Sequence, residues 1–224
     1  MAISIDTVYQ RVLALANKEQ RGYITPQEFN LFANQAQEEI FEQYFYDLNQ
    51  AARIPGNEYV YADVDDMLEE KLQIFQNEAL LGPKIPSLVY RIYRLELSGV
   101  NCEILKTKDY NDAISGGPLT KPTPKRPIAN IRKNTLRVSD GVSSNDVANI
   151  FYFTQPKKVR WGYVVVNKKA LYDPTYTINF ELHQSEESEL VYRILAYAGV
   201  TLQKPQLTQS AIGLESVKVQ QEKQ

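Results

Sequence analysis

Residues 21–29 read RGYITPQEF, and this stretch marks the boundary between two helices. Gly22 is suited to end the helix before it, because glycine readily adopts the conformations that follow a helix. Thr25 is an N-cap candidate, and Pro26 stands at the first helical position, where its missing N–H costs nothing. Glu28 follows Thr25 by three residues and completes a capping box. The stretch therefore predicts that a helix begins at Pro26.

Two further helices are predicted on either side of this one. Apolar residues recur every three or four positions from Pro26 to about Arg53, which predicts a long helix with one buried face. Residues 5–18 show the same spacing, and residues 63–75 begin with acidic residues that suit the first turn of a helix. We expect these three helices to form an N-terminal helical part over residues 1–82.

The hydrophobic pattern then changes to alternation, which indicates β-strands. The predicted strands are residues 88–97, 103–106, 131–138, 150–155, 158–167 and 177–182. Residues 109–130 are rich in glycine, proline and charge and are predicted to be a long loop. We therefore expect an antiparallel β-module over residues 87–182.

Helical spacing returns in residues 183–204, where Ser185 provides a capping signal and Gly199 ends the apolar stripe. We expect this helix to return to the N-terminal bundle. Residues 205–224 are polar and rich in glutamine, and so short a helix is marginal without a partner surface. They are predicted to be an extended docking tail that folds on a partner. The predicted fold class is α+β, with the β-module inserted between helices.

Bulk composition excludes several classes of protein. Hydrophobic residues make up 43% and charged residues 23% of the 224 residues, as in ordinary globular proteins. One cysteine allows no internal disulfide, and a reducing compartment is the natural interpretation. We find no signal-peptide pattern, and no apolar run approaches the ~20 residues that a membrane span needs. We expect a soluble protein that is made in a cytoplasm and has no membrane partner.

The sequence carries none of the common catalytic motifs. It has no phosphate loop, no dinucleotide fingerprint and no nucleophile elbow. His183 is the only histidine, and its place before a predicted cap favours a boundary residue. The acidic cluster in residues 63–70 has Leu68 where a calcium loop needs glycine, so it is interpreted as helix capping. Cys102 has no neighbouring base and is expected to be partly buried. We expect neither an enzyme nor a cofactor or metal.

Charge is distributed very unevenly along the chain. Residues 27–78 contain 12 acidic and 2 basic residues, whereas residues 84–169 contain 16 basic and 6 acidic ones. This polarity can be satisfied within one fold, or head to tail between copies of the chain. Head-to-tail contacts close into rings or extend into filaments. The 15 tyrosines suit either the rim of a core or a protein interface.

Three groups of residues are interface candidates: Tyr44, Phe45 and Tyr46; Lys121, Lys125 and Arg126; and Leu207, Ile212 and Leu214. The first group is an aromatic cluster in the long helix, for which a place in the core is the favoured interpretation, as it is for Trp161. The second lies in a proline-rich run that could be a solvated loop, an arm between subunits or a nucleic-acid contact. The pI of 5.6 counts against nucleic acid. The third belongs to the predicted tail.

Residues 21–50 resemble the N-terminal region of structural proteins from tailed bacteriophages, particularly crAss-like phages, and residues 158–200 resemble their C-terminal part. These two segments cover about a third of the chain. The overall plan also resembles the tail-tubular portal adaptor proteins of short-tailed phages.

This resemblance implies a head-to-tail connector, a collar ring subunit of the virion neck. Such a ring is expected to be a homo-oligomer, commonly twelve-fold, that joins the portal protein to the tail and continues the DNA channel. Contact with genomic DNA would be passive, along an acidic helical face, and no catalytic residues are implied. The alternatives are another virion component, such as a tail terminator, head-completion protein or fibre adaptor, a nucleic-acid-binding accessory protein, and an enzyme with an unfamiliar site.

Overall fold

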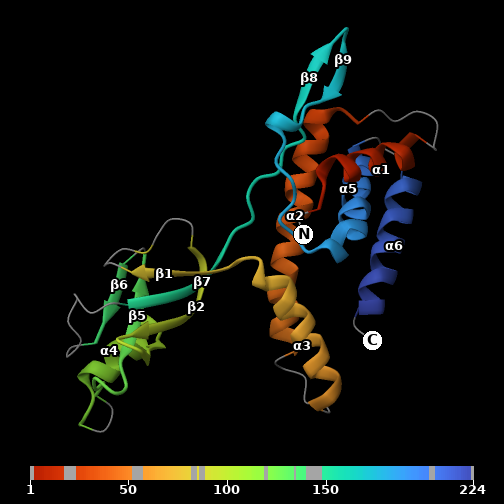
Figure 1. Ribbon diagram of the computed structural model, residues 1–224. Helices are drawn as coiled ribbons and strands as arrows, with labels where there is room; N and C mark the ends of the chain where they lie inside the picture. Colours follow the sequence, from red (N-terminus) through yellow and green to blue (C-terminus); the bar gives the residue numbers. More distant parts are fainter. Residues whose placement is uncertain are drawn as a thin grey trace. The chain divides into compact units, whose positions relative to one another are not determined.

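The computed structural model describes residues 3–17, 24–51, 58–81, 85, 89–118, 121–133, 135–139, 148–201 and 205–222. The chain divides into two compact units, which Figure 1 shows with their labelled elements. The helical unit combines Met1–Ile74 with Pro156–Gln224, and the β unit is Phe75–Gln155. The predicted α+β class, with N-terminal helices and an inserted strand module, is confirmed.

The helical unit is built around one helix from the C-terminal part of the chain. Its helices are α1 (Ile5–Asn17), α2 (Pro26–Ala51), α3 (Glu58–Gln73), α5 (Glu187–Thr201) and α6 (Pro205–Glu222), with short 3-10 turns η1 (Pro174–Tyr176) and η2 (Gln184–Glu186). Helix α5 packs against α1, α2 and α6. Its Leu190 and Ile194 are fully buried, as are Phe29 and Phe41 of α2. The predicted return of a C-terminal helix to the bundle is therefore observed.

The capping box at the start of α2 forms as predicted. The Thr25 backbone N–H and hydroxyl both donate to Glu28 Oε2, at 2.9 and 2.7 Å, and the Glu28 N–H donates to Thr25 Oγ1 at 3.3 Å. The hydrogen bonds from the Thr25 hydroxyl and N–H lower the pKa of the Glu28 carboxyl. This reciprocal pairing satisfies N–H groups that a helix start leaves without partners, and it fixes where α2 begins.

Amide side chains of α2 hold an extended segment, residues 157–161, against the helix. Asn34 accepts from the Val159 N–H at 2.9 Å and donates to the Val159 carbonyl at 2.9 Å. Asn30 makes the same pair of bonds with the backbone of Trp161, and Gln37 donates to the carbonyl of Lys157. Because side chains replace a partner strand here, the predicted strand over residues 158–167 is a sheet strand only from Tyr163 onward.

We expect Asn34→Ala to lower the free energy of unfolding by about 2–4 kcal/mol. The substitution leaves both backbone groups of Val159 without their partner, and an unpaired buried polar group costs about 1–3 kcal/mol. Chemical denaturation monitored by circular dichroism measures the change. Gln35→Ala, at an exposed position on the same helix, is the matched control and should change stability little. Equal effects of the two substitutions would contradict this role for Asn34.

The β unit contains two small sheets. Strands β1 (Gln76–Leu81), β7 (Ala148–Thr154), β2 (Val89–Leu97) and β3 (Val100–Asn101) form an antiparallel sheet in that order, and β4 (Glu103–Ile104), β5 (Ile128–Arg132) and β6 (Thr135–Val138) form the second, with β4 parallel to β5. Their shared core comprises Leu95, Leu97, Cys102, Ala129, Ile150 and Tyr152.

Helix α4 (Thr107–Ser115) corrects the expectation of a loop over residues 109–130. Its buried Tyr110 anchors the helix on the β unit. Asn130 of β5 donates to the Leu105 carbonyl at 2.9 Å just before the helix begins. The N-terminal end has no side-chain cap. The helix therefore depends on tertiary contacts that composition does not reveal.

The boundaries between the two units differ from the predicted ends of the β-module, residues 87 and 182. Strand β1 precedes residue 87, and the hairpin of β8 (Tyr163–Val166) and β9 (Lys169–Tyr172) belongs to the helical unit. The predicted strand over residues 177–182 is reduced to isolated bridges at Ile178 and Phe180. Residues 205–222 form helix α6 rather than an extended tail, because α5 supplies the partner surface that this helix needs.

Candidate interface

Helix α6 points its described charged side chains toward the rest of the helical unit. Lys218 Nζ lies 3.2 Å from Glu186 Oε2 and 3.5 Å from Glu189 Oε2. Glu215 Oε1 lies 3.2 Å from Arg193 Nη2. The side chains of Lys218 and Glu215 are only 18% and 23% exposed. Ion pairs therefore fix the side of α6 that faces α5.

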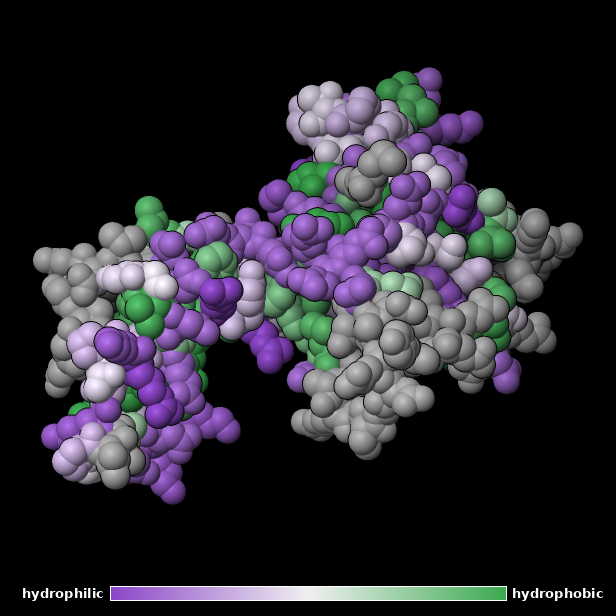
Figure 2. Space-filling model, turned by 60° about the horizontal axis from the view of Figure 1, so that its bottom comes forward, coloured by the Kyte–Doolittle hydropathy of each residue, from purple (hydrophilic) through white to green (hydrophobic). Residues whose placement is uncertain are grey.

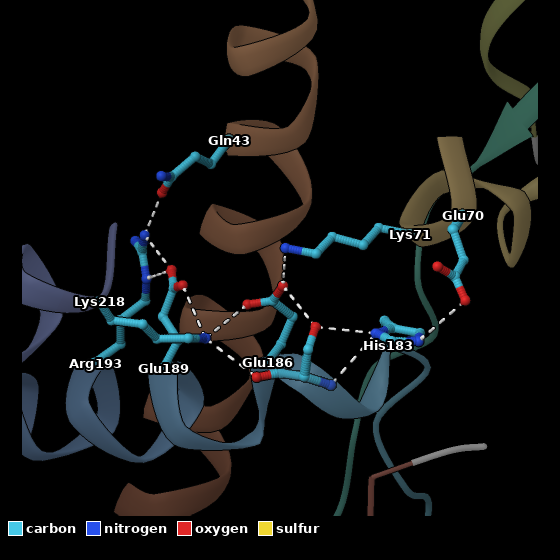
Figure 3. Close-up of polar contacts among 9 residues, drawn as sticks. Gln43, Glu70, Lys71, His183, Glu186, Glu189, Arg193 and Lys218 are labelled. Atoms are coloured by element: carbon cyan, nitrogen blue, oxygen red, sulfur yellow. Dashed lines mark hydrogen bonds and ion pairs between the residues drawn. The ribbon is translucent and has the colours of Figure 1, made fainter. Parts of the chain in front are cut away.

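These contacts belong to a larger buried cluster of charges, which Figure 3 shows gathered from α2, α3, η2, α5 and α6. Lys71 Nζ of α3 lies 2.7 Å from Glu186 Oε1, and these side chains are 9% and 1% exposed. Arg193 Nη2 lies 2.7 Å from Glu189 Oε1, and Arg193 also hydrogen-bonds Gln43 of α2. The cluster thus joins four helices through charged groups withdrawn from water.

The two buried carboxyl groups titrate differently. Burial alone would raise the pKa of Glu186, but attraction and hydrogen bonds from Lys71 and Lys218 lower it. Burial raises the pKa of Glu189, and Arg193 offsets this only in part. Since the folded pKa of Glu186 lies below its unfolded value, ionised Glu186 stabilises the fold at neutral pH. That contribution is lost as the pH falls through the folded pKa.

Three large apolar side chains of α6 are exposed to solvent. Ile212 is 52% exposed, and Leu214 and Val217 are each 51% exposed. Small residues, Ser210, Gly213 and Ser216, lie among them. A surface helix ordinarily buries its large apolar residues and exposes its charged ones. Among the described side chains of α6, Glu215 and Lys218 are largely buried beside Ala211, whereas the large apolar ones are exposed. Exposed apolar surface of this kind is typical of a site where another protein binds.

The structure places the other sequence-predicted candidates as follows. Tyr44 and Phe45 are buried in the core of the helical unit, whereas Tyr46 is 61% exposed on α2. Lys121, Lys125 and Arg126 are exposed in a turn of the β unit, where a backbone bridge joins Thr123 to Arg126. Arg126 lies 3.5 Å from Glu103.

Of the candidates in the predicted tail, Ile212 and Leu214 of α6 are both exposed. The side chain of Leu207 lies outside the described residues. Trp161 is buried, as expected.

Sequence reasoning missed a second exposed apolar surface, on the β8–β9 hairpin. Val164, Val165, Val166 and Leu171 are 46–63% exposed. An apolar run of this kind predicts a buried strand. The sequence alone does not show that no other described element packs over these side chains. The signal that could have identified a projecting hairpin is the pair Asn167-Lys168, which forms a two-residue turn with positive φ at both positions.

The described part of the chain brings together no three histidine, cysteine, aspartate or glutamate residues that could hold a metal ion. His183 caps η2, where its ring accepts from the Ser185 N–H. Cys102 is buried, and burial raises the pKa of its thiol to about 12, so it is protonated at neutral pH. Within the described ranges, no helix has both the length and the apolar character needed to cross a bilayer. The chain matches no protein-family model and no curated protein.

Proposed function

We propose that this protein is a structural subunit of a phage neck, where copies form an oligomeric ring that joins the portal protein to the tail and continues the DNA channel. The resemblance of residues 21–50 and 158–200 to phage structural proteins supplies this setting. The observation in the chain itself that supports an assembling subunit is the inverted arrangement of α6. Its charges are fixed against α5 while Ile212, Leu214 and Val217 are exposed.

The buried charge cluster suits this role because it fixes one orientation of α6. If apolar contacts alone held α6 against α5, the helix could rotate about its axis at little cost. Ion pairs to Glu186, Glu189 and Arg193 define a single rotation and therefore a single outward face. Buried polar groups are known to specify register in this way. A subunit that repeats around a ring needs such a constant surface.

Native mass spectrometry of the purified chain, alone and with the portal protein from the same genome, tests the proposal. We expect a ring mass, near twelve subunits, alone or in the presence of the portal. The variant Leu214→Asp/Val217→Asp places charges on the outward face of α6 and should abolish binding to the portal while the helical content is unchanged. A wild-type chain that remains monomeric and ignores the portal would overturn the proposal.

A further inference from the structure

The β8–β9 hairpin is an unusual surface element, because it is exposed yet rigidly anchored. Val164, Val166 and Leu171 share one face of the hairpin, since Val164 pairs with Leu171 and Val166 with Lys169. In Figure 1 the hairpin projects beyond the helices, and Figure 2 shows hydrophobic residues at this projecting end. A two-stranded hairpin is marginally stable in water by itself. An apolar face on such an element indicates that something covers it.

Contacts at the base of the hairpin hold it in place. The Trp161 ring stacks on Tyr163 and lies near Tyr172, with centroids 5.8 and 5.9 Å away. Gly162 lies so close to the chain after β9 that a Cβ there would be 2.7 Å from the Asp173 carbonyl oxygen. The tight turn at Asn167-Lys168 fixes the other end. The hairpin is thus preorganised, which lowers the entropic cost of binding.

The tip of the hairpin is basic and has no acidic partner in the described chain. Residues 163–172 include Lys168 and Lys169 but no aspartate or glutamate. Both lysines are exposed, and neither forms an ion pair with a described residue. The hairpin therefore offers an apolar face that ends in two unpaired positive charges.

A groove on α2 has the complementary character. It is shallow, has a volume of about 560 Å³, and its lining includes Leu31, Glu38 and Glu42, with Lys158 as its one basic residue. Leu31 is 70% exposed. Glu38 and Glu42 are one helical turn apart, so they repel each other, and neither forms an ion pair with a described residue. Helix α2 contains no lysine or arginine that could relieve this repulsion.

The spacing of the two surfaces also agrees. Leu31, Glu38 and Glu42 lie along one stripe of α2, and at 1.5 Å per residue the two carboxylates are roughly 10 and 16 Å beyond Leu31. On the hairpin, Lys169 pairs with Val166 and so lies roughly 7 Å beyond Val164 at 3.3 Å per residue, and Lys168, in the turn, lies roughly 10 Å beyond it. A hairpin placed along α2 with Val164 at Leu31 therefore brings Lys168 level with Glu38, about one helical turn before Glu42.

We propose that the β8–β9 hairpin of one copy docks in the α2 groove of the next copy. The face formed by Val164, Val166 and Leu171 covers Leu31, and the lysines at the tip pair with Glu38 and Glu42. This heterologous contact deepens the proposed function, on which it rests, because it names the surfaces that join neighbouring subunits. It assigns the acidic face of α2 to a subunit contact rather than to the wall of a DNA channel.

A charge-exchange experiment tests this contact. In the hairpin variant Lys168→Glu/Lys169→Glu, or in the groove variant Glu38→Lys/Glu42→Lys, like charges meet, and self-association measured by sedimentation velocity should weaken by about tenfold or more. In a one-to-one mixture each hairpin again finds a groove of opposite charge, so association should recover. The control Lys106→Glu/Lys108→Glu makes the same change in charge at exposed positions of the β unit and should associate like the wild type.

Photo-cross-linking locates the contact independently of the charges. With a photoreactive residue in place of Val166, cross-links should reach the peptide containing Leu31–Glu42 of a second, isotope-labelled copy. The inference would be overturned if either charge variant associated like the wild type, or if the mixture associated no more strongly than its two components. It would also be overturned if the cross-links reached another part of the chain, or if the wild type were monomeric at every concentration. A ring with cross-links elsewhere rejects this contact alone, whereas cross-links to α2 in open chains without rings reject the ring alone.

Discussion

Replacing Lys71 with methionine is expected to lower the free energy of unfolding by about 3–5 kcal/mol, the usual cost of removing one partner from a buried ion pair. Methionine fills a similar volume, so the cost arises from the charge that remains. The Glu186 side chain is 1% exposed and would keep only Lys218, at 3.2 Å, as a cationic partner. Denaturant titration followed by circular dichroism measures the loss.

Two further variants separate the effect of burial on stability from the effect of losing any ion pair. Lys157→Met removes the partner of Glu181 at the same distance, 2.7 Å, but the Lys157 side chain is 78% exposed. Its loss should change stability little, because water screens such pairs. The double variant Lys71→Met/Glu186→Gln carries no unpaired carboxylate and should recover part of the stability lost in Lys71→Met. If Lys71→Met cost no more than Lys157→Met, burial of the cluster would not matter.

Local signals in the sequence predicted α1, α2 and α5 well, but they placed the start of α3 at residue 63, whereas the helix begins at Glu58. The capping box at Thr25 and Glu28 gave the start of α2, and three-four spacing gave α1 and α5 within a few residues. These signals succeed because each depends on residues that are neighbours along the chain. Strand β1 was missed since QNEALL follows α3 with no proline or glycine between them, and its strand conformation comes from pairing with β7.

The features that define the candidate interface depend on contacts between distant residues. Asn34 pairs with Val159, 125 positions away, and nothing near either residue indicates this. Lys71 and Glu186 are of residue types that usually lie on the surface, yet both are buried. The candidates Ile212 and Leu214 could be named from the sequence as apolar residues in a polar segment. That they are exposed while Glu215 and Lys218 are largely buried could not be predicted, because the orientation of α6 is set by α5.

Trp161→Ala is expected to lower the free energy of unfolding by about 3–5 kcal/mol, because it opens a large cavity in the core of the helical unit. Trp161 is 3% exposed, its ring centroid lies 4.4 Å from that of Tyr9, and its Nε1 donates to Asp6 Oδ1 at 2.9 Å. Since it is the only tryptophan, unfolding must be followed by circular dichroism rather than by its fluorescence.

Two milder variants show how much of the stability lost in Trp161→Ala comes from packing and how much from hydrogen bonding. Trp161→Phe keeps an aromatic ring against Tyr9 but loses the bond to Asp6, so it should cost less than Trp161→Ala. Asp6→Asn keeps an acceptor for Nε1 and should be the mildest of the three. Trp161 also supports the base of the hairpin through Tyr163 and Tyr172, so Trp161→Phe should weaken self-association in a chain that is still folded. If Trp161→Phe were as destabilising as Trp161→Ala, the bond to Asp6, rather than the packing of the ring, would be the main contribution of this residue.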